Sequence, residues 1–121
     1  MADGFDWSSF VEIPGFGNRW DAIGGSDADL RILQLQLLAA PTRGPVVPGA
    51  GGWRKIRFAM PSSGRGKSGG IRVYYADLPK SGIILLGTAF SKVEMADLGR
   101  TDKKLLGELL AEYRRLFEEG L

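Results

Sequence analysis

The alternation of apolar and polar residues along the chain predicts four short strands. The first lies in SSFVEIP (8–14), where Pro14 ends the alternation. Three further runs follow in the second half of the chain: WRKIRFA (53–59), IRVYYA (71–76) and GIILLGTAF (82–90). Short links join these three runs, and short links favour antiparallel hairpins over parallel crossovers.

Two longer segments carry apolar residues at a spacing typical of helices. SDADLRILQLQLLAAP (26–41) has Ser26 as a good N-cap and Pro41 as its end. TDKKLLGELLAEYRRLFEEGL (101–121) has Thr101 or Asp102 as its cap. A short helix is also expected at 15–24, between the first strand and the helix at 26–41. The order of elements predicts a single α+β domain over 1–121, in which helices pack on one face of a small antiparallel sheet.

Composition narrows the possible chemistry. The chain has no cysteine and no histidine, which excludes disulfides, thiolate metal sites and acid–base catalysis by histidine. No metal and no cofactor are expected. No apolar run approaches the roughly 20 residues of a membrane span, and the first ten residues lack the basic start and apolar core of a secretory signal. These features predict a cytoplasmic protein with no membrane partner.

Positive charge is concentrated in the middle of the chain. Residues 43–75 hold seven basic residues and no acidic one, although the net charge of the chain is only +2. The seven are Arg43, Arg54, Lys55, Arg57, Arg65, Lys67 and Arg72. A block of unopposed positive charge attracts polyanions such as nucleic acids. The alternative is a solvated basic surface without a ligand.

The two-residue period of the strands gathers several of these cations on one face of the predicted sheet. If helices cover one face only, the open face carries, in chain order, Lys55, Arg57, Arg72, Tyr74, Phe90 and Lys92. Such a surface suits single-stranded RNA, because aromatic rings stack on bases while cations hold phosphates. Arg54 lies on the opposite face, beside Ile56 and Phe58, near the start of its strand. The alternative is that Tyr74 and Phe90 fill a second small core.

The glycine-rich segment GRGKSGG (64–70) supplies the last three residues of a phosphate-binding Walker A loop. Pro61, however, occupies the position of that loop's first glycine, and a strand follows where a nucleotide-binding loop needs a helix. The segment is therefore predicted to be a hairpin loop that carries Arg65 and Lys67 over the edge of the basic face. The alternative is a loop with incidental charges.

Two motifs in the basic region, GWRKIRF (52–58) and GKSGGIRV (66–73), give the chain a resemblance to a known family. Single matches follow at Lys92, Glu94, Asp97 and Leu98. With these motifs the sequence resembles the RelE/HigB superfamily of type II toxin–antitoxin toxins, in its HigB-like branch. The likeness covers about residues 9–117 and implies a RelE-like ribonuclease fold.

The resemblance implies a metal-independent endoribonuclease, an mRNA interferase that needs no cofactor. Many members of the superfamily cleave mRNA in the ribosomal A site and stop translation, and a cognate antitoxin neutralises them. The implied antitoxin is a HigA- or RelB-like, DNA-binding protein. In the implied reaction the RNA 2′-hydroxyl attacks the adjacent phosphate and leaves a 2′,3′-cyclic phosphate and a free 5′-hydroxyl.

The resemblance also implies roles for individual residues. The implied catalytic cations, which stabilise the extra negative charge of the transition state, are Lys55, Arg57, Arg72 and Lys92. The implied RNA-binding residues are Arg54, Arg65, Lys67, Tyr74 and Phe90. A lysine among other cations can act as the base, because nearby positive charge favours the neutral amine. Lys55 is the first choice for this base and Lys92 the second.

The chain departs from the family pattern at two positions. Phe90 stands where a tyrosine is common, so this side chain can stack but cannot donate a proton. Trp53 stands where a leucine or isoleucine is usual, and it is interpreted as a packing residue or a platform for a base. Glu94 is interpreted as structural. These departures keep an alternative open, a catalytically inactive RNA- or protein-binding module of the same fold.

Overall fold

The computed structural model describes residues 9–63, 70–92 and 98–119. In chain order the elements are β1 (Phe10–Glu12), α1 (Phe16–Ala22), α2 (Asp27–Ala39), β2 (Arg54–Phe58), a 3₁₀ helix (Pro61–Ser63), β3 (Ile71–Leu78), β4 (Ile83–Ser91) and α3 (Arg100–Glu118). The strands form one sheet in the order β1-β4-β3-β2. None of the helices in these described ranges is both long and apolar enough to cross a membrane.

The α+β class is confirmed, but the sheet is mixed. β3 is antiparallel to both β2 and β4, as the short links predict. β1 is instead parallel to β4, so the expectation of a wholly antiparallel sheet is wrong at this strand. The reason is the long connection, since α1, α2 and two strands separate β1 from β4 and give the chain room for a crossover.

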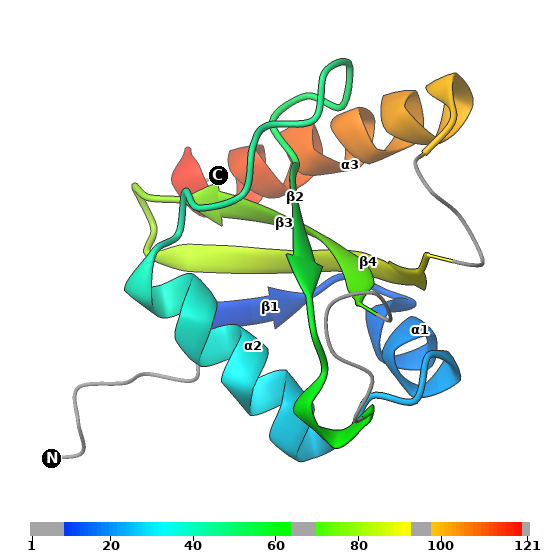
Figure 1. Cartoon of the computed structure of the whole chain (residues 1–121). Coiled ribbons are helices and arrows are strands. Elements are labelled where there is room, and N and C mark those ends of the chain that lie inside the picture. The colour runs from blue at the N-terminus through cyan, green and yellow to red at the C-terminus, as the bar shows by residue number, and fades with distance from the viewer. Residues whose placement is uncertain (1–8, 64–69, 93–97, 120–121) are drawn as a thin grey trace, which may run out of the picture.

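Helices cover both faces of the sheet, so the expectation of helices on one face is also wrong (Figure 1). On β3, Val73 and Tyr75 face a core that includes Trp20 of α1 and Leu33 of α2. Tyr74, Ala76 and Leu78 of the same strand face a second core that includes Leu110 of α3. Both α2 and α3 have an apolar stripe, and such a stripe does not specify which face of a sheet the helix will cover.

α3 covers only part of its face. The helix is fixed by Trp53, whose indole Nε1 donates a 2.7 Å hydrogen bond to the carbonyl oxygen of Leu106. Leu110 is buried, whereas Leu105 is 58% exposed and Leu116 is 49% exposed. The helix begins at Arg100, after a Gly99 N-cap that makes no side-chain cap bond, so Thr101 or Asp102 does not cap it as expected.

α2 begins as its sequence predicts. The Ser26 hydroxyl accepts a hydrogen bond from the backbone N–H of Asp29, and the Asp29 carboxylate accepts one from the backbone N–H of Ser26. Asp29 is only 1% exposed and also accepts hydrogen bonds from the backbone N–H and the hydroxyl of Ser62. This capping residue therefore ties the start of α2 to the 3₁₀ helix that follows β2.

A bulge in β4 sets the orientation of the residues that follow it. Tyr74 of β3 pairs with Thr88 and Tyr75 pairs with Leu86, so Gly87 has no partner in the ladder. A Cβ atom at Gly87 would lie 2.7 Å from the Trp53 ring. Glycine is therefore the residue that fits at this position without a clash. Beyond this bulge Thr88 and Phe90 face the side of α3, which agrees with their predicted common face.

Candidate functional site

The strand register aligns the predicted site residues in two rows across β2, β3 and β4. In the first row Lys55 pairs with Tyr74, and Tyr74 pairs with Thr88. In the second row Arg57 pairs with Arg72, and Arg72 pairs with Phe90. Residues paired in this way have Cβ atoms roughly 4.5–5.5 Å apart. The register therefore brings Lys55, Arg57 and Arg72 together, as predicted from the strand period.

These three cations border an open hollow of about 490 Å³ at the β2 edge of the sheet. This hollow is here called the basic hollow, and it is lined by Arg43, Pro45, Lys55, Ile56, Arg57 and Arg72. Four of the six are basic and none is acidic. Like charges directly opposite each other destabilise a strand pair, so the Arg57–Arg72 pair costs the fold stability. A cluster of cations around one open hollow is suited to a ligand with several negative charges.

Arg43 is a functional candidate that the strand pattern does not identify. It belongs to the basic block in the sequence, but it comes from the loop between α2 and β2. This loop returns alongside β2, where the backbone N–H of Lys55 donates a 3.1 Å hydrogen bond to Pro45. No motif marks Arg43, and its place at the hollow results from the path of the loop.

Arg54 holds the same loop in place. Its guanidinium Nη1 donates to the carbonyl oxygens of Gly44 at 2.8 Å and Thr42 at 3.3 Å. The Tyr75 hydroxyl adds a second clamp, since it donates to Pro41 and accepts from the backbone N–H of Gly44. Burial raises the pKa of Tyr75, although the Gly44 hydrogen bond acts in the opposite direction. Arg54 thus stabilises the loop that carries Arg43.

Of the two aromatic candidates, one is buried and one lines a pocket. Tyr74 is 1% exposed, so its expected place on an open surface is wrong; α3 and its neighbours enclose it in the second core. Its ring meets that of Phe90 edge-on, with 6.4 Å between the centroids. Trp53 is fully buried as well, so it packs and offers no platform for a base. Phe90 is half-buried and lines a pocket beside α3.

Arg19 of α1 adds a cation that the sequence pattern does not identify. Its guanidinium carbon lies 4.9 Å from the centre of the Phe90 ring. Its Nε donates a 3.0 Å hydrogen bond to the carbonyl oxygen of Ala89, 70 residues further along the chain. A contact over such a separation leaves no local signal in the sequence.

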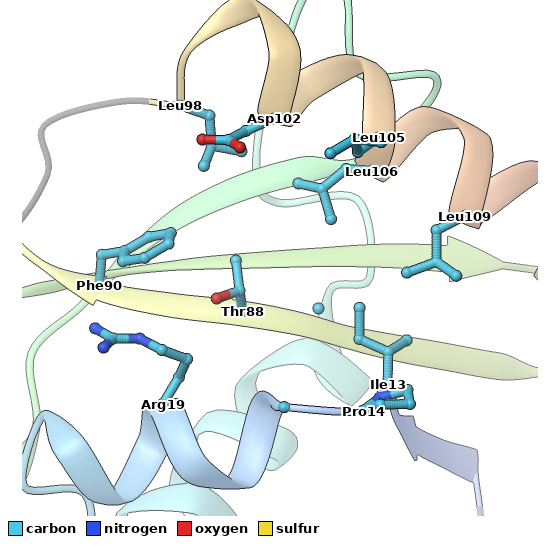
Figure 2. Close-up of a pocket in the computed structure, with 12 residues that line it drawn as sticks. Ile13, Pro14, Arg19, Thr88, Phe90, Leu98, Asp102, Leu105, Leu106 and Leu109 are labelled. Carbon is cyan, nitrogen blue, oxygen red and sulfur yellow. The ribbon is translucent and has the colours of Figure 1, made fainter.

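The pocket that Phe90 lines is here called the α1–α3 pocket, and its volume is about 410 Å³ (Figure 2). Its lining residues are Ile13, Pro14, Gly15, Arg19, Gly87, Thr88, Phe90, Leu98, Asp102, Leu105, Leu106 and Leu109. Most of this lining is apolar. Three side chains are polar, and among them Arg19 and Asp102 enter from opposite walls, from α1 and α3 (Figure 2).

The remaining candidates lie at or beyond the ends of the described segments. Lys92 is exposed and directly follows β4, whose last residue Ser91 pairs with Ile71, next to Arg72. It therefore lies at the same end of the sheet as the Arg57–Arg72 row. Arg65, Lys67 and Glu94 fall outside the described residues, and their roles stay predictions. Within the described ranges, no group of three or more acidic side chains could hold a metal ion.

A comparison with models of known protein families finds none that matches the chain.

Proposed function

We propose that the protein is a metal-independent endoribonuclease, the toxin of a type II toxin–antitoxin pair, and that it cleaves mRNA in the cytoplasm. The observation that carries this proposal is the basic hollow. Two neighbouring strands and one loop direct four cations to a single open site, and none of the described residues that line it is acidic. The described parts of the motifs that resemble those of the RelE/HigB superfamily, 52–58 and 70–73, overlap the same two strands.

The proposed reaction needs only groups of the RNA and these cations. A base removes the proton of the 2′-hydroxyl, and the 2′-oxygen attacks the adjacent phosphorus. The bond from phosphorus to the 5′-oxygen breaks, the leaving oxygen takes up a proton from solvent water, and the base returns the proton that it removed to the solvent. Arg57 and Arg72, placed before the substrate arrives, stabilise the extra negative charge on the phosphate. Lys55 is the proposed base and Lys92 the second candidate for that role.

The partners of this activity follow from the same proposal. The ribosome presents single-stranded mRNA at its A site, and the ribosomal RNA around it is a polyanion that attracts the basic block. A HigA- or RelB-like antitoxin is the proposed inhibitor. The exposed apolar residues Leu105 and Leu116 of α3 offer this inhibitor a surface to pack on.

The second candidate is a module of the same fold that binds RNA or protein without cleaving RNA. The observation that favours it is Phe90, which cannot act as a proton donor, together with the burial of the nearest tyrosine, Tyr74. Under this alternative the basic hollow would hold a phosphate, and no bond would break.

The test is inducible expression in a bacterial host, with mapping of new mRNA 5′ ends. The wild type is compared with Lys55→Ala/Arg72→Ala, which removes two cations of the hollow. The matched control is Lys80→Ala/Lys104→Ala, which removes two exposed lysines outside it. We expect growth arrest and in-frame cuts for the wild type and the control, and neither for the hollow variant. Normal growth and intact mRNA with soluble wild-type protein would favour the binding module.

A further inference from the structure

The α1–α3 pocket and the basic hollow are neighbours on one face of the sheet. Arg72 lines the hollow, Phe90 lines the pocket, and the two residues pair directly across β3 and β4. Adjacent strands lie about 4.8 Å apart. A nucleotide whose phosphate is held near Arg72 would therefore have its base within reach of Phe90.

The shape and the lining of the pocket suit a planar ring. Its volume of about 410 Å³ is in the range of small-ligand sites. The Phe90 ring forms one wall, and α3 contributes Leu105, Leu106 and Leu109. Gly87 keeps the sheet side of the pocket free of a side chain, because any Cβ there would clash with Trp53. Aromatic and apolar walls of this kind bind splayed bases by stacking.

The polar groups of the pocket distinguish a base from an apolar protein side chain. Arg19, Thr88 and Asp102 all line it, and a leucine or phenylalanine from a partner would remove these groups from water without a hydrogen bond in return. A nucleobase, in contrast, brings its own donors and acceptors. An RNA base is therefore the better occupant.

Asp102 indicates which base fits. An ionised carboxylate only accepts hydrogen bonds, and its two oxygens can accept two neighbouring donors at once. Guanine is the RNA base with two adjacent N–H donors on one edge, at N1 and N2. Asp102 lies in the first turn of α3, where its exposed side chain lines the rim of the pocket beside Leu98 (Figure 2).

We propose that the α1–α3 pocket binds the base of the nucleotide adjoining the scissile phosphate and selects guanine through Asp102. This inference rests on the proposed function, because the phosphate beside the bound base is scissile only if the protein cleaves RNA. The binding of a guanine nucleotide can be tested without any cleavage.

The first experiment titrates the full chain with guanosine, adenosine, cytidine and uridine 3′- and 5′-monophosphates and follows the backbone amide resonances by NMR. We expect the guanosine nucleotides to shift the amides of Thr88, Phe90 and Asp102 and to bind at least about fivefold more tightly than the others. Asp102→Asn should lose this preference and keep its fold. The matched control is Asp27→Asn, which changes an exposed aspartate in the first turn of α2.

Three results would overturn the inference. They are equal affinity for the four bases, no response of the pocket amides to any nucleotide, and an unchanged guanine preference in Asp102→Asn. A response of the same amides to a leucine-rich amphipathic peptide, with none to the nucleotides, would assign the pocket to a protein partner and would also overturn it.

The second experiment separates this inference from the proposed function by mapping cut sites in cells. If wild type cuts beside guanosine and Asp102→Asn cuts without that preference, both proposals stand. If both proteins cut with the same pattern, the protein is a ribonuclease and the guanine pocket is refuted. If no RNA is cut but guanosine nucleotides still bind the pocket selectively, the ribonuclease proposal fails while the guanine site itself stands.

Discussion

The substitution Arg57→Glu should abolish RNA cleavage and at the same time make the folded protein more stable. Arg57 of β2 lies directly opposite Arg72 of β3, and both line the hollow, whose lining within the described part of the chain holds no acidic residue. The substitution replaces a repulsive cross-strand pair with an attractive one. It also removes one of the cations proposed to stabilise the transition state. Stability and function are thus expected to move in opposite directions.

The size of the stability gain follows from the position of the pair. Opposite charges directly across two strands stabilise by roughly 0.2–1 kcal/mol relative to two alanines, and like charges destabilise. Arg57 is exposed and Arg72 is half-buried, so solvent screening keeps the effect small. We expect the free energy of unfolding to rise by roughly 0.5–1 kcal/mol, which corresponds to an increase in Tm of about 2–6 °C for a domain of this size.

The assay is thermal unfolding at low and at high salt, with Lys80→Glu as the matched control. Lys80 is exposed and lies outside the hollow. Each substitution replaces one positive with one negative charge, so both take the net charge from +2 to 0. Arg57→Glu should gain Tm relative to this control at low salt and lose most of the gain at high salt. Cleavage should fall at least about 100-fold in Arg57→Glu only.

Two outcomes would refute this reasoning. A Tm for Arg57→Glu at or below that of Lys80→Glu would show that the two arginines do not repel each other in the folded protein. Cleavage by Arg57→Glu at the wild-type rate would show that the hollow is not the site of reaction.

Three further substitutions test the framework around the site. Asp29→Asn should lower the free energy of unfolding at pH 7 by roughly 1–3 kcal/mol, because Asp29 accepts hydrogen bonds from Ser62 and caps α2. Burial raises the pKa of Asp29, but the hydrogen bonds from Ser62 and Ser26 outweigh burial, so the net pKa is lowered. The stability contributed by the ionised carboxylate is therefore present above pH about 4 and is lost as pH falls through the lowered pKa. The difference between Asp29→Asn and wild type in urea unfolding should accordingly shrink in acid. Its persistence in full at pH 2 would contradict this account. Burial raises the pKa of Asp77, with a smaller contribution from the nearby carboxylate of Glu118. The ionised form therefore costs stability, so Asp77→Asn should raise Tm at pH 7 and have no such effect below pH about 4, where the carboxyl is protonated in both states; a lower Tm at pH 7 would contradict it. Gly87→Ala should cost about 1–3 kcal/mol in urea unfolding, because the new methyl group meets the ring of Trp53, and a neutral effect would show that the ring can move aside.

Much of the fold follows from local patterns. The apolar runs locate all four strands, because successive side chains point to opposite faces of the sheet and, in β3 and β4, enter the two cores in turn. The Ser26 cap fixes the start of α2 through a hydrogen bond to a residue three positions away. The pairing of β2, β3 and β4 follows from the short links between them, and with it the alignment of Lys55, Arg57 and Arg72.

The sequence alone thus determined the elements, the antiparallel pairing of β2, β3 and β4, and the concentration of positive charge, because each of these depends on neighbours along the chain. Tertiary structure decided which face α3 covers, and this burial removes Tyr74 from any open surface while Phe90 lines a pocket. It also brought Arg19 to Phe90 and Arg43 to the hollow, from a helix and a loop whose own sequences carry no sign of a site. Contacts between distant segments depend on how whole surfaces fit together, and a pattern read along one segment does not contain that information.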